Sequence, residues 1–252
     1  MKLPTLQELL TAGAHFGHQA SRWHPKMAPY IFGVRSGIHV INLERTQEEL
    51  GKALDVVKSI AAKGGVILFV GTKSQAKKYV RAAAEDCGMP FVTERWLGGT
   101  LTNFKQIRDA VDRYLKLKEQ QLKGELGKYT KLERLMIARD IEECDVKIGG
   151  IATLKKKPEA VFITDVRFDK TAVMEAIACN IPIVGVCDTN VNPDRVTHVI
   201  PMNDDAVRSI ELVTKLVAEA VKEGKANPVV LEKKVEKIGK ETKKAEALKV
   251  QA

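Results

Sequence analysis

The stretch V-I-L-F-V-G-T-K-S at residues 66–74 decides the fold expected for the whole chain. Five consecutive apolar residues predict a strand buried on both faces, and the glycine that follows them begins a turn into a helix over residues 74–86. Apolar runs recur at residues 160–164 and 183–186, with a helical pattern over residues 171–179 between them. This alternation predicts an α/β fold in which a parallel sheet carries helices on both faces.

The N-terminal part predicts smaller elements. Leucines at helical spacing indicate a helix that ends near Gly13, and Thr5 with Glu8 has the spacing of a capping box. Two short strands are expected at residues 30–34 and 38–43, after an irregular polar and aromatic stretch.

The C-terminal part predicts a short strand at residues 196–200 and a final helix that reaches about residue 223. We expect Asp204 or Asp205 to cap that helix. Residues 225–252 are rich in Lys and Glu and contain no aromatic residue, which is typical of a charged, flexible tail.

Residues 103–147 break the alternation of strand and helix. They are highly charged and predict two helices joined at Gly124 and Gly127, which we interpret as an antiparallel coiled-coil hairpin inserted between the halves 1–102 and 148–224 of the α/β domain. Two ordinary surface helices are the alternative. The apolar seam is expected at Phe104, Ile107, Val111, Tyr114 and Leu122, and on the returning helix at Leu132, Leu135, Met136 and Ile141.

The composition favours an anionic partner and a reducing compartment. The formal net charge is +9, which suits nucleic acid or an anionic membrane surface. No stretch has the ~20 apolar residues of a membrane span, and the N-terminus lacks a signal-peptide pattern, so a cytoplasmic location and no membrane partner are expected. The four cysteines do not have the spacing of a structural zinc site. They are expected to be thiols in the core: Cys87, Cys144, Cys179 and Cys187.

An enzyme is the rival hypothesis. The turn at residues 71–74 offers backbone N–H groups and Lys73 at a helix N-terminus, although it matches neither G-x-x-x-x-G-K-[ST] nor G-x-G-x-x-G. Asp165 and Asp188 follow buried strands and should lie at one edge of the sheet. Together these residues could serve a phosphate-ligand enzyme such as a sugar-phosphate isomerase, or the two aspartates could simply cap helices.

A cation site is a second possibility. H-x-x-H at His15 and His18 could place two imidazoles on one helical face. His18 together with Asp188 and either Asp204 or Asp205 would form a mixed nitrogen and oxygen site for a metal ion. The alternative is that the histidines form local hydrogen bonds or contact RNA.

RNA binding is the main hypothesis, because basic and aromatic residues are interleaved. Arginine and lysine bind phosphates, tryptophan offers a stacking face, and asparagine and histidine donate to sugars or bases. Trp23 and Trp96 could instead be core residues flanked by solvated charges. The candidates are Arg22, Trp23, His24, Lys26, Arg35, Lys73, Arg95, Trp96, Asn103, Lys105, Arg108, Lys155, Lys156 and Lys157.

Several strings together are similar to the bacterial ribosomal protein S2 family, the second protein of the small ribosomal subunit. The string at residues 95–103 is the most specific, and the matches are collinear from residue 6 to about 224. They include H-F-G-H-Q at 15–19, W-H-P-K-M at 23–27, H-V-I-N-L at 39–43, L-F-V-G-T at 68–72, R-W-L-G-G-T-L-T-N at 95–103, D-T-N at 188–190 and I-P-x-N-D-D at 200–205. Residues 144–148 and 166–171 depart from the family pattern, which leaves their local geometry open.

This resemblance implies a flavodoxin-like (Rossmann-like) domain with a protruding helical hairpin. It also implies a structural role in the small ribosomal subunit, bound to ribosomal RNA and to neighbouring ribosomal proteins, including ribosomal protein S1. On this basis we expect no enzymatic activity, no cofactor and no homo-oligomer.

Overall fold

The computed structural model describes residues 3–228, except for the side chain of Lys128. Its centre is a five-stranded sheet in which every neighbouring pair of strands is parallel, which confirms the predicted α/β fold. From one edge to the other the strands are β5 (Phe91–Val92), β4 (Ile67–Val70), β6 (Ala160–Ile163), β7 (Ile183–Cys187) and β8 (His198–Pro201).

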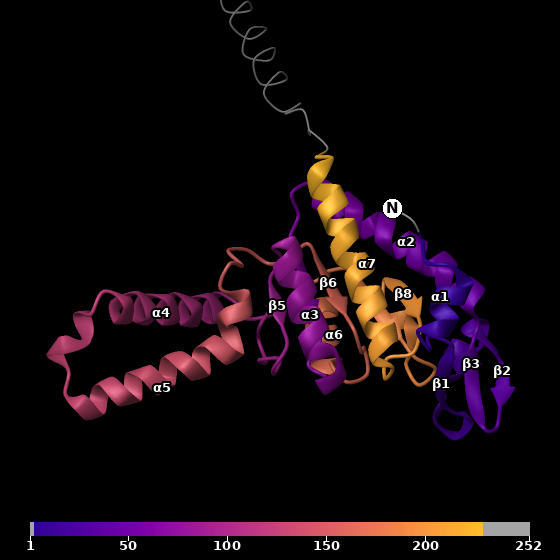
Figure 1. Ribbon diagram of the computed structural model, residues 1–252, viewed down its shortest axis with the longest axis horizontal. Helices are drawn as coiled ribbons and strands as arrows, with labels where there is room; N and C mark the ends of the chain where they lie inside the picture. The colour runs from indigo at the N-terminus through magenta and orange to yellow at the C-terminus, as the bar shows by residue number, and fades with distance from the viewer. Residues whose placement is uncertain (1–2, 229–252) are drawn as a thin grey trace, which may run out of the picture.

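Helices cover both faces of this sheet. One layer contains α2 (Leu43–Ala62), α3 (Ser74–Cys87) and α7 (Val207–Ala226), which lie in front of the strands in Figure 1. The opposite face is covered by α6 (Lys170–Ala178) and by residues near the base of the inserted hairpin. Because side chains alternate along a strand, Phe69 packs into the first layer and the neighbouring Leu68 into the second.

A small antiparallel sheet lies at the end of the domain that is opposite the hairpin (Figure 1). Its strands β2 (Ile31–Arg35) and β3 (Ile38–Ile41) are the two that the sequence predicts. A third strand, β1 (Phe16–Gln19), pairs with β3 inside the stretch expected to be irregular. The helix before it, α1 (Leu6–Thr11), has the predicted capping box.

The predicted cap of the last helix is wrong. Helix α7 begins at Val207, and its N-cap residue, Ala206, makes no side-chain cap. Asn203 organises the turn instead, because its Oδ1 accepts hydrogen bonds from the backbone N–H groups of Asp205 (2.8 Å) and Ala206 (3.3 Å). The carboxylate of Asp204 is engaged elsewhere, with Lys73.

The inserted segment forms an arm that leaves the β5 edge of the sheet (Figure 1). It consists of α4 (Phe104–Leu122), the short 3-10 helix η3 (Glu125–Lys128) and α5 (Lys131–Ile148). Coiled-coil packing is not confirmed, because the two helices diverge toward the tip. Val111, Tyr114 and Ile141 are buried nearer the root, whereas four apolar residues of the predicted seam farther out are exposed: Leu122, Leu132, Leu135 and Met136.

Four more 3-10 segments lie within residues 3–228: η1 (Ala20–Arg22), η2 (Pro25–Tyr30), η4 (Gly149–Ile151) and η5 (Pro193–Arg195). None of the helices within residues 3–228 combines the length and apolarity needed to cross a membrane. Most of the predicted C-terminal tail, from residue 229 onward, lies outside the described residues.

Helices α2 and α7 approach closely at Gly224, where an added Cβ would lie 2.5 Å from the backbone oxygen of Lys58. We expect Gly224→Ala to lower the free energy of unfolding by about 1–3 kcal/mol, because backbone must shift to admit the methyl group. Gly51→Ala is the control, since its Cβ would meet only the flexible side chain of Leu3. It should be neutral or stabilising by up to about 1 kcal/mol. Urea unfolding of both variants measures the difference, and equal stability would contradict the close approach.

Candidate functional site

Charged residues gather at the carboxyl ends of the central strands. Lys73 follows β4, Asp165 follows β6, Asp188 follows β7, and Asp204 lies in the turn after β8. Parallel strands deliver the residues that follow them to one edge of the sheet, which is where ligands of such sheets bind. The predicted meeting of Asp165 and Asp188 at one edge therefore becomes part of a larger cluster.

His18 reaches this cluster from the small sheet. It lies on strand β1, so the helical face expected for the H-x-x-H pattern is wrong. Its backbone N–H donates to Thr189 Oγ1 at 2.9 Å. Gly17 makes the approach possible, because a Cβ there would come within 2.6 Å of the Thr189 side chain.

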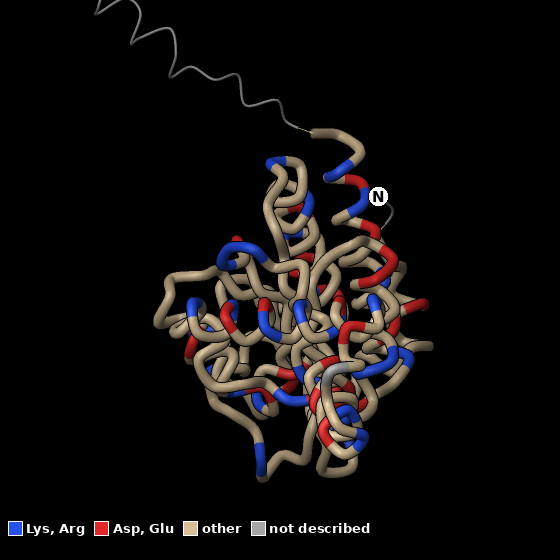
Figure 2. The backbone as a smooth tube through the Cα atoms, turned by 90° about the vertical axis from the view of Figure 1, so that its left-hand side faces the viewer, with Lys and Arg blue, Asp and Glu red and all other residues tan. Residues whose placement is uncertain are grey.

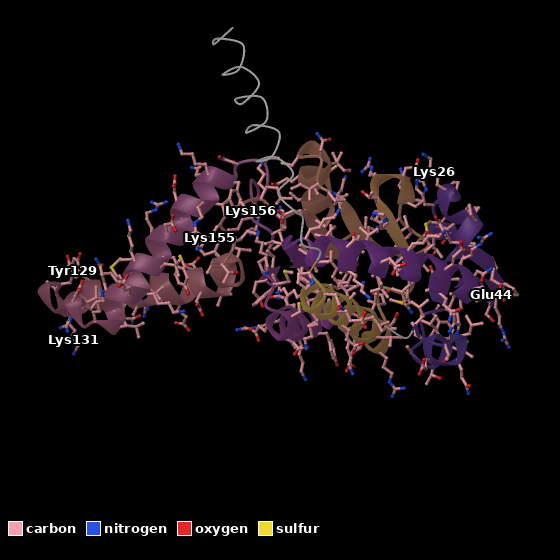
Figure 3. The ribbon with its side chains drawn as sticks, turned by 90° about the horizontal axis from the view of Figure 1, so that it is seen from above. Lys26, Glu44, Tyr129, Lys131, Lys155 and Lys156 are labelled. Carbon is pink, nitrogen blue, oxygen red and sulfur yellow. The ribbon has the colours of Figure 1, made fainter. Side chains whose placement is uncertain are left out.

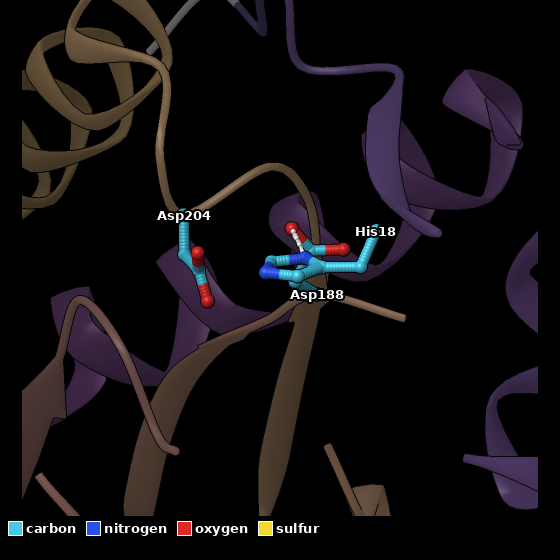
Figure 4. Close-up of side chains that lie close together, drawn as sticks. All are labelled: His18, Asp188 and Asp204. Atoms are coloured by element: carbon cyan, nitrogen blue, oxygen red, sulfur yellow. Dashed lines mark ion pairs between the residues drawn. The ribbon is translucent and has the colours of Figure 1, made fainter. Parts of the chain in front are cut away.

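The side chains of His18, Asp188 and Asp204 converge. One potential ligand atom from each lies within 4.8 Å of the others, and Figure 4 shows both carboxylates facing the imidazole. His18 Nδ1 lies 2.9 Å from Asp188 Oδ2, which has no well-aligned hydrogen bond within the described chain although it is buried. The close approach of the Asp188 carboxylate is the main reason why the pKa of His18 is raised. The fold thus brings together the three residues that the sequence suggested for a cation site.

Asp205, the alternative candidate, lies at the rim of the cluster. Its Oδ2 is 3.6 Å from His18 Nε2, and its side chain is 55% exposed, whereas that of Asp204 is 2% exposed. Asp204 is therefore the better third ligand, because a buried carboxylate is fixed in place and a solvated one is not.

Lys73 lies inside the cluster instead of facing solvent. Its ammonium is 3.0 Å from Asp165, 2.9 Å from Asp204 and 2.6 Å from Asp205, and only 14% of its side chain is exposed. Burial by itself would lower the pKa of Lys73, but these carboxylates outweigh burial and raise it. The geometry argues against the expected RNA contact, because its charge is already compensated.

The buried negative charge exceeds what Lys73 can neutralise. Asp165, Asp188 and Asp204 are 5%, 1% and 1% exposed. Burial, together with repulsion from Asp165 and Asp188, raises the pKa of Asp204 to about 7. Unpaired buried charge is costly, so the cluster favours either an added proton or an added cation.

The turn at residues 71–74 is a poor phosphate site. The backbone N–H and hydroxyl of Thr72 both donate to the buried carboxylate of Asp169, the hydroxyl at 2.7 Å. A phosphate there would also lie beside the carboxylates that hold Lys73. Asp165 has a further structural role, because its Oδ1 accepts from the N–H groups of Arg167 and Phe168. The geometry therefore argues against the enzyme hypothesis.

The first basic and aromatic group lies beside the small sheet. Arg22 and Arg35 are exposed, and Trp23 is 39% exposed while it stacks against His39 with ring centroids 5.1 Å apart. The Nδ1 atom of His24 accepts from the Lys26 backbone N–H, and the ammonium of Lys26 pairs with Asp194. Arg22, Trp23 and Arg35 are consequently the more available members of this group.

The second group is divided between surface and core. Arg95, Asn103 and Lys105 are exposed, but Trp96 is only 8% exposed and its Nε1 donates to Glu175 at 3.0 Å. Trp96 is therefore a core residue, as the alternative held, and its face is not free to stack on a base.

Arg108 fastens the root of the arm. One of its guanidinium nitrogens donates to the carbonyl oxygens of Ala152 and Leu154, both at 3.1 Å, and the other pairs with Asp112. These contacts join α4 to the chain that follows the arm, so the guanidinium is already engaged within the protein.

The lysine run at residues 155–157 lies on the surface near the root of the arm. Lys156 pairs with Glu159, and the ammonium of Lys157 lies 3.4 Å from Cys179 Sγ. Figure 3 places Lys155 and Lys156 between the tip of the arm and Lys26 at the opposite end of the molecule. Figure 2 shows Lys and Arg interspersed with Asp and Glu, so positive charge is distributed over the surface.

Two features of the structure were not predicted from the sequence. Glu175 is a buried carboxylate in the middle of α6, where a lone Glu gives no sign of its partners. The small sheet also exposes an apolar face beside a groove, with Phe16, Phe32 and Val34 respectively 53%, 79% and 57% exposed. Alternating apolar residues in a short strand indicate one buried face, and only the structure reveals that this face is uncovered.

A comparison with protein families gives a match that covers most of the chain. The family model described as "Ribosomal protein S2" matches residues 9–224. The matched segment includes the whole central sheet, the arm, the carboxylate cluster and both basic groups.

The charge balance of the cluster makes a pH-dependent prediction. Lys73→Met should destabilise the protein by about 3–5 kcal/mol at pH 8, because the buried carboxylates of Asp165 and Asp204 lose their counter-charge. The deficit should shrink as the pH falls toward 5. Burial and the neighbouring carboxylates raise the pKa of Asp204 to about 7 even beside Lys73, so its carboxyl group gains a proton in the folded protein as the pH falls.

Lys77→Met is the matched control, because Lys77 lies in helix α3, which begins directly after Lys73, and forms a partly exposed ion pair with Glu94. It should cost less than about 1 kcal/mol at either pH. Urea unfolding at pH 5 and pH 8 tests both variants. A Lys73→Met deficit that is independent of pH would contradict the charge argument.

Proposed function

Because the chain belongs to the ribosomal protein S2 family, a family of structural ribosomal proteins, we propose that it binds small-subunit ribosomal RNA through separated basic surfaces and docks neighbouring proteins. The family match over residues 9–224 is the observation that carries this proposal. Its site of action is then the ribosome in the cytoplasm. The enzyme alternative gains no support from the family, and the engaged state of Thr72 and Lys73 argues against it.

Two exposed groups are the proposed RNA contacts. Arg22 and Arg35 with the half-exposed ring of Trp23 form one, and Arg95, Asn103 and Lys105 form the other. No ion-pair partner for these arginines or for Lys105 is found among residues 3–228, so their charges are available for phosphates. Each lysine or arginine that contacts a phosphate releases counterions, which makes binding dependent on salt.

The two basic groups are placed so that one protein could bridge two RNA elements. The first lies beside the small sheet at the β8 side of the domain, and the second lies where the chain leaves β5 for the arm. Lys155 adds an exposed charge near the root of the arm (Figure 3). One rigid protein could therefore hold two RNA elements at a fixed separation, mainly through phosphate and shape contacts.

The apolar face of the small sheet is the proposed docking surface for a ribosomal protein neighbour. Its exposed side chains include Phe16, Phe32, Val34 and Ile38. Exposed apolar patches on soluble proteins commonly mark interaction sites. Ribosomal protein S1 is the neighbour that the family resemblance suggests.

A divalent cation is a second proposal, and it concerns the cluster of His18, Asp188 and Asp204. The observation in its favour is the excess of buried carboxylates around one half-buried imidazole. An imidazole and two carboxylates are a donor set that suits Zn²⁺ or Mn²⁺. The ion would join strand β1 to the central sheet.

Charge neutralisation tests the RNA proposal. The triple variant Arg22→Ala, Arg95→Ala, Lys105→Ala should bind small-subunit ribosomal RNA more weakly, with a salt slope lower by about two to three units. A control variant with the same loss of charge on the helical layer, Lys63→Ala, Lys78→Ala, Lys215→Ala, should change the slope much less. Filter binding of the full chain at a series of salt concentrations measures both slopes, and equal effects would contradict the assignment.

Added metal tests the cation proposal. After dialysis against a chelator, Zn²⁺ or Mn²⁺ at about 100 times its Kd should stabilise the protein by about 2.7 kcal/mol, which raises Tm by several degrees. Asp188→Asn should abolish the response, whereas Asp205→Asn at the exposed rim should retain most of it. A wild-type Tm that neither ion changes would refute the proposal.

A further inference from the structure

The loop that connects β5 to the arm is folded around one carboxylate. Glu175 Oε1 accepts from Trp96 Nε1 at 3.0 Å and from the Gly99 backbone N–H at 2.8 Å. Its Oε2 accepts from the backbone N–H groups of Leu101 (2.9 Å) and Thr102 (3.2 Å), and from the Thr102 hydroxyl at 3.2 Å. Five donors from residues 96–102 therefore converge on a side chain more than seventy positions later in the sequence.

Glu175 is well placed to act as a fixed acceptor. It lies in α6, whose residues Ala172, Val173 and Ala176 pack against the central sheet. Only 8% of Glu175 is exposed, and burial by itself would raise the pKa of its carboxyl group. The donors outweigh burial and lower the pKa, so the carboxylate is charged in the folded protein. Hydrogen bonds to a charged acceptor are roughly twice as strong as neutral ones.

The backbone of this loop is turned toward an acceptor that lies outside the loop. Gly99 has φ +91°, a region that favours glycine, and the N–H groups of Gly99, Leu101 and Thr102 all turn toward Glu175. Backbone N–H groups that converge on one point favour an anion there, and here the anion is a side chain of the same protein. A neutral side chain at position 175 would weaken all of these bonds together.

The residues that flank this loop form the second basic group. Trp96 and Leu101 face inward and are buried, whereas Arg95, Asn103 and Lys105 are exposed. Helix α4 begins at Phe104, directly after the loop. The carboxylate thus contacts the short segment that connects Arg95 to Asn103 and to the start of the arm.

We propose that Glu175 is a positioning residue for RNA binding: by holding the loop at residues 96–102, it presents Arg95, Asn103 and Lys105 to the RNA. This inference rests on the proposed RNA-binding function. The alternative is that the packing of Trp96 and Leu101 alone fixes the loop. Glu175→Gln separates the two, because it keeps the size of the side chain and removes its charge.

The first measurement concerns the loop without RNA. In a Trp23→Phe background, in which Trp96 is the remaining tryptophan, Glu175→Gln should shift the Trp96 emission and accelerate amide hydrogen exchange at residues 99–102. Exchange in β4, β6 and β7 should be unchanged. Unaltered loop exchange would overturn the proposal, because the loop would then hold its shape without the charge.

The second measurement is a double-mutant cycle with ribosomal RNA. Arg95→Ala should weaken binding severalfold in the wild-type chain and less than about twofold in the Glu175→Gln chain, because the loop no longer presents that side chain. Arg22→Ala, on the other side of the domain, should weaken binding equally in both chains. This control separates a positioning effect from a general loss of stability.

Three results are distinguishable. If Arg95→Ala weakens RNA binding equally in the wild-type and Glu175→Gln chains, the positioning role is overturned, even if hydrogen exchange in the loop is faster. If Glu175→Gln reduces the effects of Arg22→Ala and Arg95→Ala equally, the positioning role is also overturned, since the substitution would then have changed the whole protein. No effect of either arginine in the wild-type chain contradicts the proposed RNA contacts, and hydrogen exchange then decides separately whether Glu175 holds the loop.

Discussion

The structure depends on a sheet whose strands are apolar along both faces. Such a sheet is stable only when both faces are covered, because each exposed apolar side chain would lose the free energy gained by burial. Helices α2, α3 and α7 supply one cover, and α6 with the base of the arm supplies the other. This requirement explains why helices cover both faces of the sheet. The parallel direction of the strands brings the polar residues that follow them to one edge.

That edge concentrates charge, which makes it both a structural joint and a candidate binding site. Strand β1 is attached there through His18 and Thr189, and Lys73 ties the turn after β4 to the turns after β6 and β8. Buried ion pairs contribute little net stability, but they allow few alternative arrangements of the segments that they join. The cluster therefore contributes chiefly to a defined arrangement of several loops.

The sequence was sufficient for elements with a strong pattern and insufficient for side-chain partners. Runs such as residues 66–70 predicted the buried strands, because a short, continuous apolar run bounded by glycines is typical of a strand covered on both faces. Strand β1 was missed because H-F-G-H-Q lacks a clear alternation. Lys73, Trp96 and Arg108 have the chemistry of RNA contacts, yet each is engaged within the protein. Only the fold decides which charged residues meet each other and which meet solvent.

The divergence of α4 and α5 has a mechanical consequence. Helix α4 has 19 residues, which at about 1.5 Å per residue gives a length of roughly 28 Å. The two helices and the segment at the tip enclose a triangle whose narrow end is fixed to the domain (Figure 1). Sideways displacement of the tip within that plane must stretch one helix and compress the other, whereas bending out of the plane meets less resistance. The arm is therefore stiff in one direction and compliant in the perpendicular one.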